Sequence, residues 1–366
     1  MRWSGRTSTG SVAAVLSDYG LDDRVRALAS EAVGSCTNGT ADTPELGRVA
    51  RIDRGAYTVV TETGTRRVPL SAPLRETPEP EMRPAIGDWV LVIDDTVGAV
   101  LDRRSAFRRG DAERLQAQVV AANVDTVFVV HDSAEVNARR LERELALAWE
   151  SGALPVLVLT KCDLVVDPAA SIDTATEVAP GLDLVATSAV TGEGIETLAA
   201  FARPARTVAF IGASGVGKSS LVNVLLGEDT QAIGAVRASD GRGRHTTSHR
   251  ELFLLPGGGV VIDTPGLRTI GMWQSDDGIA RVFPDIEALA GGCRFRDCAH
   301  DREPDCAVRA AVDSGTLDPA RLRNYREMLA ELDHLDRESE VRARLERKRH
   351  AKILSRAIRN LPKRPT

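Results

Sequence analysis

A glycine-rich stretch at residues 212–219 carries the clearest chemical signal in this chain of 366 residues. It reads GASGVGKS and matches the pattern Gly-x4-Gly-Lys-Ser/Thr in full. The glycines let backbone N–H groups point at phosphate oxygens, and a following helix N-terminus adds a favourable dipole. Lys218 would reach the β- and γ-phosphates of a nucleotide, and Ser219 would bind Mg²⁺. The predicted phosphate site comprises Gly212, Ala213, Ser214, Gly215, Val216, Gly217, Lys218, Ser219 and Ser220.

Two further polar stretches would complete the phosphate and metal side of this site. VVIDTPG is an apolar run that ends in an acid, so Asp263 would lie beside the Mg²⁺ ion while the Gly266 N–H senses the γ-phosphate. RGRHTTSHR (242–250) lies where a γ-phosphate switch is expected, although it could also be an ordinary basic loop. Either of two threonines there could complete the Mg²⁺ shell, and the sequence does not choose between them. These candidates are Thr246 and Thr247.

A loop upstream, TKCD at 160–163, resembles the guanine-reading motif Asn-Lys-x-Asp of GTPases. Asp163 would accept hydrogen bonds from the ring N–H and the amine of guanine, a pattern that adenine cannot offer. Lys161 would stack its stem along the base and brace the phosphate loop. Thr160 stands where the motif has asparagine, and its shorter hydroxyl predicts looser nucleotide binding with the preference for guanine retained.

The elements that must position these loops alternate between apolar runs and helical patterns. The strand-like runs are VDTVFVVHD, PVLVLT, LDLVATSA, RTVAFIG and GGVVIDTPG. This alternation predicts a doubly wound, mostly parallel α/β sheet, which binds ligands at the carboxyl ends of its strands. The third run ends in TSA (187–189), where a backbone N–H of Ser188 or Ala189 would lie near the guanine oxygen.

The order of the motifs along the chain is unusual. In an ordinary GTPase the phosphate loop comes first and the guanine loop follows, whereas here the guanine loop precedes the phosphate loop. A sheet tolerates this change when the original chain ends lie close enough to be joined. The sequence therefore predicts a circularly permuted GTPase domain.

Short β-rich runs with turn residues between them precede this domain and predict a small barrel. A five-stranded oligonucleotide-binding (OB-like) barrel fits their length, and an SH3-like barrel fits nearly as well. Residues before the barrel are polar and irregular apart from one predicted helix, and no function is assigned to them. The predicted domains are an N-terminal extension (1–44), the OB-like β-barrel (45–110), the permuted GTPase domain (111–275) and a zinc-binding, basic helical domain (276–366).

Composition limits the class of protein and its compartment. The formal charge is −5, and no apolar run approaches the length of a bilayer span. The N-terminus lacks a signal-peptide pattern, so we expect a cytoplasmic protein that does not bind membranes. A basic segment is hidden within the acidic average, because residues 347–364 carry eight Lys or Arg residues and no acid. Such a run is often only a solvated face, but here it favours contact with a nucleic-acid backbone over a membrane or calmodulin-like target.

Three of the five cysteines crowd into CRFRDCAHDREPDC (293–306). Cys293, Cys298, His300 and Cys306 could close a tetrahedral structural zinc site with no open position for catalysis. Such a site would replace the hydrophobic core that this arginine- and aspartate-rich segment cannot build. A redox pair or scattered buried thiols are the alternative interpretations.

Taken together, these motifs resemble the ribosome small-subunit-dependent GTPase A family (RsgA, also called YjeQ). The resemblance rests on the order TKCD, TSA, phosphate loop, switch and DTPG, and it extends over about residues 45–366. It implies a monomeric GTPase, with Mg²⁺ and one structural Zn²⁺, that binds the small ribosomal subunit and its 16S-type rRNA and assists or checks late maturation. It also implies that the subunit stimulates hydrolysis. A metabolic P-loop kinase or ATPase, and an RNA-binding scaffold that uses GTP only as a conformational ligand, are the competing interpretations.

The predicted catalytic machinery has a gap. Ras-like GTPases place a glutamine after Asp-x-x-Gly to orient the attacking water, and this chain has Leu267 there. We therefore expect slow hydrolysis by the isolated protein. His245 in the switch is a candidate for positioning water, since similar family members carry a histidine there, but it could equally be a solvated loop residue. The catalytic set predicted from the sequence is Lys218, His245, Asp263 and Gly266.

Overall fold

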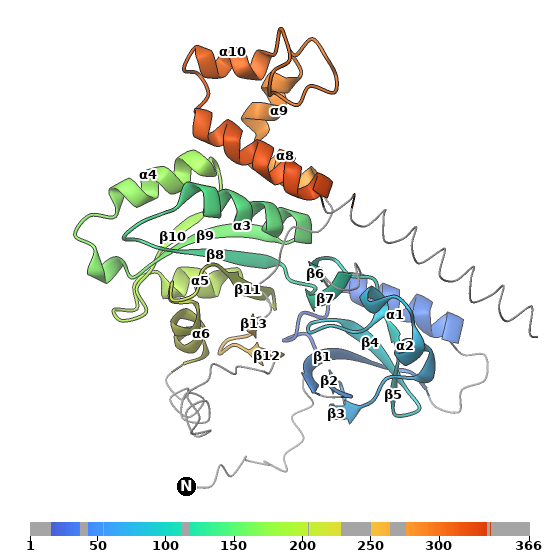
Figure 1. The fold of residues 1–366 in the computed structure, drawn as a ribbon. Helices are drawn as coiled ribbons and strands as arrows, with labels where there is room; N and C mark the ends of the chain where they lie inside the picture. Colours follow the sequence, from blue (N-terminus) through green and yellow to red (C-terminus); the bar gives the residue numbers. More distant parts are fainter. Residues whose placement is uncertain are drawn as a thin grey trace, which may run out of the picture. The chain divides into compact units, whose positions relative to one another are not determined.

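The structure is a computed structural model, shown in Figure 1. It describes residues 16–36, 43–53, 55–110, 117–203, 205–227, 250–263, 276–334 and 337. The chain divides into two compact units, the first made of residues 1–109 and 116–271 and the second of 110–115 and 272–366. No helix in the described ranges is long and apolar enough to cross a bilayer.

A mostly parallel sheet forms the centre of the first unit. Its strands lie in the order β10-β9-β8-β11-β13-β12, and every neighbouring pair is parallel except β13 and β12. The bounds are β8 Thr126–Asp132, β9 Leu154–Thr160, β10 Leu184–Ala186, β11 Thr207–Ile211, β12 Arg250–Leu254 and β13 Val260–Asp263. Strands β8, β9, β11 and β13 are nearly continuous apolar runs because both faces of the sheet are covered.

Helices cover both faces of this sheet, as the doubly wound prediction requires (Figure 1). One face carries α3 (Ala138–Ser151) and α4 (Ala169–Val178), and the other carries α5 (Ile195–Phe201) and α6 (Lys218–Leu226). Helix α3 begins where the Asn137 side chain accepts the Arg140 N–H, and it ends at Gly152, whose φ of 83° is left-handed.

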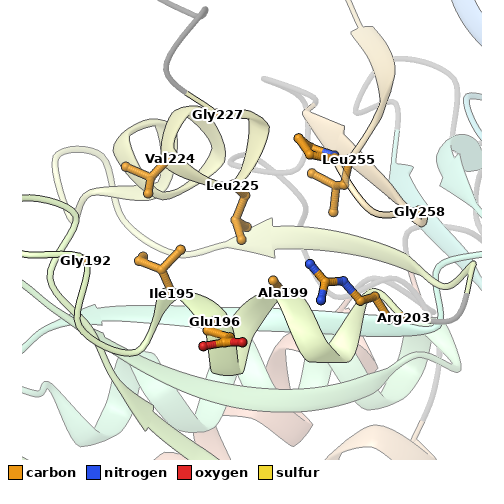
Figure 2. Close-up of a pocket in the computed structure, with 11 residues that line it drawn as sticks. Gly192, Ile195, Glu196, Ala199, Arg203, Val224, Leu225, Gly227, Leu255 and Gly258 are labelled. Atoms are coloured by element: carbon orange, nitrogen blue, oxygen red, sulfur yellow. The ribbon is translucent and has the colours of Figure 1, made fainter.

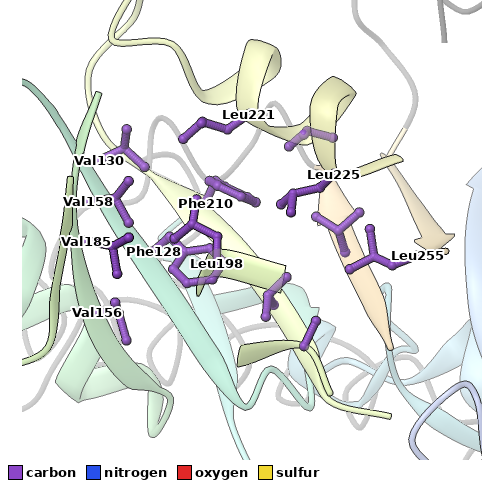
Figure 3. Close-up of a cluster of buried hydrophobic side chains, with 14 residues drawn as sticks. Phe128, Val130, Val156, Val158, Val185, Leu198, Phe210, Leu221, Leu225 and Leu255 are labelled. Atoms are coloured by element: carbon purple, nitrogen blue, oxygen red, sulfur yellow. The ribbon is translucent and has the colours of Figure 1, made fainter. Parts of the chain in front are cut away.

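The core under α5 and α6 is built from side chains that point to one face of the sheet (Figure 3). Phe128 lies at its centre, with its ring centroid 4.9 Å from that of Phe210 and 5.9 Å from that of Phe201. Leu198 of α5 and Leu221 of α6 close the cluster from above the sheet, and both are 1% exposed or less. This packing fixes the strands whose ends carry the polar loops.

The sheet order confirms the circular permutation. Strand β11 precedes the phosphate loop and comes fourth of the six strands along the chain, yet it lies between β8 and β13 in the sheet. Strands β9 and β10, which precede the loops predicted to bind guanine, come earlier in the chain but lie to one side of β11 in the sheet. The chain therefore enters the domain at a strand that an unpermuted GTPase reaches only after its phosphate loop.

A five-stranded barrel precedes the parallel sheet. Its strands are β1 (Glu45–Asp53), β2 (Ala56–Thr61), β3 (Gly64–Val68), β4 (Trp89–Ile93) and β5 (Thr96–Val100). Strand β1 pairs with both β2 and β4, and β4 pairs with β5. A parallel bridge between Leu70 and Val97 brings the end of β3 to β5, which closes the ring as in an OB-like barrel. Two short helices, α2 (Ala72–Glu76) and η1 (Pro80–Met82), lie between β3 and β4.

Helix α1 (Asp23–Cys36) lies on the barrel and supplies part of its core. Leu21, Val25 and Ala29 recur at helical spacing and are buried against barrel residues that include Trp89 and Leu91. The residues before the barrel, to which the sequence assigned no function, therefore include a structural element of the first unit.

The barrel is joined to the parallel sheet by backbone and by a buried arginine. Strand β1 pairs antiparallel with β12, and the two-stranded ribbon of β6 (Ala106–Gly110) and β7 (Ala117–Ala122) leads into β8. Arg48 of β1 is 1% exposed and donates to the carbonyl oxygens of Gly87 and Asn123 and to the Thr207 hydroxyl at 3.1, 3.2 and 2.8 Å. Burial lowers the pKa of Arg48 to about 10, although nearby carboxylates oppose the shift.

The second unit is helical. It contains α8 (Asp276–Val282), α9 (Pro284–Ala290), α10 (Ala307–Asp313) and a helix over 319–334. Its small core contains Phe283 and Tyr325, whose rings meet edge to face at 5.4 Å. Arg321 covers Phe283 and binds both carboxylate oxygens of Asp285 at 2.8 Å.

Candidate functional site

Five polar segments meet at one edge of the parallel sheet. Strands β8, β9, β10, β11 and β13 run in the same direction, so the segments at their carboxyl ends share this edge. The predicted phosphate loop follows β11, the predicted guanine loop follows β9, and the TSA segment follows β10. Asp132 ends β8, and Asp263, predicted to lie near Mg²⁺, ends β13.

The phosphate loop needs its glycines for steric reasons. Gly212 has a φ of 137°, and a Cβ there would come within 2.4 Å of the Val130 carbonyl oxygen. Gly217 has a φ of 101° and begins helix α6. Lys218 follows in the first turn, is only 7% exposed, and donates from Nζ to the carbonyl oxygens of Gly212, at 2.7 Å, and Ala213. The lysine is therefore folded over the loop whose ligand it is predicted to bind.

The guanine loop begins with a left-handed residue. Lys161 has a φ of 60°, which is costly for a side-chain-bearing residue and turns the chain sharply out of β9. The turn continues as the short helix η2 (Cys162–Leu164). Lys161 Nζ lies 2.7 Å from Asp132 Oδ2, so the end of β8 holds the side chain predicted to stack on the base.

The surroundings of Asp132 favour its ionised form. Partial burial alone would raise its pKa, but the Lys161 ammonium and the Ala134 N–H bond its carboxylate and leave the pKa below its ordinary value. Strand β8 lies between β9 and β11, so this carboxylate stands between the guanine loop and the phosphate loop. Asp132 was not predicted from the sequence, where its only signal is that it ends an apolar strand, as Asp263 does.

The carboxylate of Asp163 is oriented by the neighbouring TSA segment. The Ser188 hydroxyl donates to Asp163 Oδ1 at 2.5 Å, and this serine is fully buried. The same hydroxyl oxygen accepts the N–H groups of Val190 and Thr191 at 3.2 and 3.1 Å. The sequence predicted that this segment would supply a backbone N–H to the base. The structure adds a side-chain contact that orients the Asp163 carboxylate. Ser188 binds only Oδ1 of that carboxylate, not Oδ2.

Thr160 joins the guanine loop to the phosphate loop. Its hydroxyl lies 2.5 Å from the Val216 carbonyl oxygen and 3.2 Å from that of His131, and the side chain is 3% exposed. A hydroxyl carries a single proton, so the shorter contact to Val216 is the hydrogen bond that matters more. Threonine thus provides the link between loops that an asparagine amide would otherwise supply.

The four predicted zinc ligands come together in the second unit. Their ligand atoms all lie within 4.8 Å of one another. Cys293 Sγ is 3.8 Å from Cys306 Sγ and 3.7 Å from His300 Nδ1, and that nitrogen is 3.4 Å from Cys306 Sγ. Tetrahedral Zn²⁺ with Zn–S bonds of about 2.3 Å requires sulfur atoms about 3.8 Å apart. The residues therefore fit a zinc ion.

The loop around these ligands is organised by backbone contacts. The Glu303 carboxylate accepts the N–H groups of Ala299, Asp301 and Arg302 at 2.8–3.0 Å. Its own backbone N–H, followed by these three, lowers its pKa to about 2. Desolvation and the neighbouring thiols raise the pKa of Cys298 to about 11. The pKa of Cys293 is lowered instead, by backbone N–H groups and by the other two thiols, which outweigh its desolvation. The three thiols therefore interact closely, and a bound divalent cation would favour their thiolate forms.

Comparison with known proteins identifies the family. The family model described as RsgA GTPase matches residues 100–273. The small ribosomal subunit biogenesis GTPase RsgA of Streptomyces avermitilis is 47% identical over 316 residues, which cover 83% of this chain and 84% of that protein. Its counterpart in Streptomyces coelicolor is 44% identical over 351 residues, 93% of each chain. The chain belongs to the RsgA GTPase family.

Solved structures agree with this membership. YjeQ from Thermotoga maritima is 28% identical with a TM-score of 0.59, over 79% of this chain and 98% of that one. YloQ, described as a circularly permuted GTPase, is 26% identical with a TM-score of 0.56, over 80% of this chain and 96% of that one. As an RsgA GTPase the chain is a GTP-hydrolysing enzyme, and Mg²⁺ accompanies GTP in such enzymes.

Several residues predicted for the RsgA site lie outside the described ranges. They are His245, Thr246, Thr247 and Gly266. The basic segment 347–364 also lies outside them. The roles given to these residues therefore stay predictions.

A separate pocket of about 500 Å³ opens between α5 and α6 (Figure 2). Ile195, Ala199 and Leu225 give it apolar walls, and Glu196 and Arg203 contribute charges. It contains none of the predicted nucleotide residues, so it is not the RsgA nucleotide site.

Proposed function

We propose that this protein is a small ribosomal subunit biogenesis GTPase. In this proposal it binds the small subunit and its 16S-type rRNA and assists or checks late maturation. The subunit accelerates GTP hydrolysis, and hydrolysis drives release. The observation that carries the proposal is the shared name of relatives that are 44–47% identical and match 84–93% of their own length. The RNA-binding scaffold is not favoured, because these relatives are named as GTPases.

The guanine site supports the nucleotide part of the proposal. Asp163 would read guanine, Lys161 would stack on it, and Ser188 and Ala189 would lie near its oxygen. The phosphate loop, residues 212–220, would hold the phosphates. Mg²⁺ would be bound by Ser219, Asp263 and a switch threonine. The fixed Asp163–Ser188 contact and the Thr160 link between loops support one continuous nucleotide surface.

Further parts of the proposal concern the metal, the partner and the compartment. The Cys293–Cys306 cluster would hold one structural Zn²⁺, and the basic segment 347–364 would contact rRNA backbone. The protein would act as a cytoplasmic monomer without binding membranes. The proposed domains are the N-terminal extension (1–44), the OB-like barrel (45–110), the permuted GTPase domain (111–275) and the zinc-binding, basic helical domain (276–366).

The decisive experiment measures GTP hydrolysis with and without purified small subunits. We expect low basal turnover and strong stimulation, with stimulation reduced when residues 342–366 are removed. Absence of stimulation in the intact protein would contradict the proposal and revive the scaffold interpretation. Large subunits serve as the control partner, and ADP competition at concentrations similar to GDP would instead indicate a P-loop kinase or ATPase.

Two substitutions distinguish a loss of nucleotide binding from a loss of GTP hydrolysis. Lys218→Ala should abolish nucleotide binding, because the phosphate loop loses its cation. His245→Ala should lower subunit-stimulated turnover and leave GDP binding and basal turnover nearly unchanged. An equal loss of basal and stimulated rates in the His245 variant would remove this residue from the proposed catalytic set.

A further inference from the structure

One aromatic side chain stands out on the surface of the second unit. Phe295 is 41% exposed and lies in the loop that carries the predicted zinc ligands. It is the only exposed aromatic side chain among the residues that the structure describes. Its chain neighbours, Arg294 and Arg296, are exposed as well. The pattern Arg-Phe-Arg therefore presents a ring between two cations.

The loop holds this ring in place. Cys293 and Cys298, two of the clustered ligands, flank it in the chain. The Arg294 N–H donates to the Asp305 carbonyl oxygen at 3.3 Å, and the Arg294 guanidinium binds the Asp305 carboxylate at 2.9 Å. Both contacts join the two ends of the loop. A ring presented by such a closed loop loses little conformational freedom on binding, which favours its use as a contact.

The exposed ring and the arginine that follows it, rather than the overall charge of the loop, indicate a planar partner with an adjacent anionic group. The Arg294 guanidinium lies 5.5 Å from the centroid of the Phe295 ring, within cation–π range. Of the acids in this loop, Asp301 and Asp305 pair with arginines of the same unit and Glu303 is bound by backbone N–H groups, which leaves Asp297 as the acid beside Arg296 in the chain. Among the described residues Arg296 has no ion pair, so its charge is available to a partner.

We propose that Phe295 stacks on an unpaired RNA base of the small subunit while Arg296 binds an adjacent phosphate. Single-stranded RNA is recognised in this way, by aromatic rings that stack on bases and by arginines that bind the backbone. The inference rests on the proposed function and deepens it. The basic segment was predicted to contact only backbone and shape, whereas this loop contacts a base.

The test compares Phe295 variants of the full-length, zinc-loaded protein in binding to purified small subunits. Phe295→Ala and Phe295→Leu should weaken binding about 5- to 150-fold, the range expected for losing one base–aromatic stack. Phe295→Trp should retain or improve it. Leucine is the informative variant, because it keeps apolar volume without a π-face. Normal affinity in the Leu variant would overturn the proposal in favour of an apolar protein contact.

Matched controls separate the contact from folding. Leu154→Ala truncates a similarly exposed apolar side chain, 51% exposed at the start of β9, and should leave binding unchanged. All variants should keep their zinc content. Arg296→Gln should reduce the slope of log affinity against log salt by about one, as expected for one lost phosphate contact. An unchanged slope would remove Arg296 from the proposal.

A photo-crosslinking phenylalanine analogue at position 295 identifies the partner directly. Crosslinks to rRNA at a nucleotide without a base-pairing partner would support the inference, and crosslinks only to ribosomal proteins would overturn it. If the unmodified protein does not bind small subunits, the proposed function itself fails. If it binds them and Phe295→Ala binds equally well, only the stacking contact fails.

Discussion

The nucleotide loops and the zinc-ligand loop are held in position by different parts of the structure. The nucleotide loops extend from strands that are buried on both faces, and Thr187 N–H still bonds Leu159 O at 2.7 Å where the guanine loop begins. In the zinc-ligand loop, residues 293–306, only His300 and Cys306 are buried. The hydrophobic core therefore holds the nucleotide loops in position. The backbone of the zinc-ligand loop must instead be held by the four predicted zinc ligands themselves.

The difference predicts how each site responds to damage. A substitution in a nucleotide loop removes a contact but leaves the core under α5 and α6 in place, so its effect should stay local. A substitution of a zinc ligand removes the structure that carries the loop, so its effect should spread through the second unit.

Removing one zinc ligand should unfold the loop around it. We expect Cys306→Ser to lose bound zinc and to expose residues 293–313 to hydrogen exchange, while strands β8 to β11 stay protected. Structural zinc contributes on the order of 10 kcal/mol in small domains. Zinc content by elemental analysis and exchange by mass spectrometry measure the two effects. Chelation of the unmodified protein should give the same pattern.

Cys162→Ser is the matched control for this experiment. It makes the same atomic change in the guanine loop, where the thiol has only a weak contact with the Leu159 carbonyl oxygen at 3.6 Å. It should keep its zinc and its exchange pattern. Loss of protection in β8 to β11 of the Cys306 variant would contradict the contrast between a core-supported and a ligand-supported site.

Changing the acid of the guanine loop should alter specificity without unfolding. Asp163→Asn replaces one acceptor by a donor, so it no longer matches the N–H and amine of guanine but does match a xanthine carbonyl. We expect GDP affinity to fall by about a hundredfold or more, because hydrogen bonds to a charged group contribute about 1.5–3 kcal/mol each. Xanthosine diphosphate should bind better than it does to the unmodified protein.

Calorimetric titration with GDP, xanthosine diphosphate and ADP measures this change. Asp173→Asn, an exposed acid on α4, is the control and should behave as the unmodified protein. A parallel loss of affinity for all three nucleotides would mean that Asp163 supports the loop rather than reads the base.

The two sites also differ in what could be predicted from sequence. Apolar runs of strand length, each ending in a polar motif, predicted the parallel sheet and the edge where the loops meet. The prediction was possible because the carboxyl ends of parallel strands always share one edge of a sheet. The zinc cluster was equally visible, since its four ligands are close in the chain. The OB-like barrel was predicted from turn spacing, but the choice over an SH3-like barrel needed the Leu70–Val97 bridge.

Contacts between distant segments could not be predicted. The Ser188 hydroxyl on Asp163, the Asp132 carboxylate on Lys161 and the packing of α1 on the barrel all join parts of the chain whose spacing carries no pattern. Each depends on which strands become neighbours in the sheet or barrel. That information resides in the packing rather than in any single motif.

The hydroxyl of Thr160 should have a moderate effect. Thr160→Val keeps the shape of the side chain but leaves the Val216 carbonyl without its donor, and one buried hydrogen bond contributes about 1 kcal/mol. We expect GDP to bind about fivefold more weakly and GDP to remain preferred over ADP. Thr160→Ser should restore binding, and Thr160→Asn should tighten it. A changed preference between guanine and adenine would place Thr160 in base recognition instead of loop support.

The smallest expected effect is at Asp132, and it requires a double-mutant cycle. The Asp132–Lys161 pair is about one-third exposed on each side, so its net contribution should lie below about 1 kcal/mol. Asp132→Asn should therefore weaken GDP binding no more than about fivefold, by freeing the ammonium and the stem predicted to stack on the base. In a Lys161→Met background, which keeps the stem without the charge, Asp132→Asn should have no further effect.

Fluorescent GDP analogues give the dissociation rate and affinity for all four proteins of the cycle. Asp53→Asn is the control, because Asp53 makes an ion pair of 3.0 Å with Arg51 that is similarly exposed but lies in the barrel. It should not change GDP binding. Equal effects of Asp132→Asn in both backgrounds would show that the carboxylate acts independently of Lys161, for example through the Ala134 N–H. In that case even the core-supported site would depend on a local backbone contact, as the zinc-ligand loop depends on Glu303.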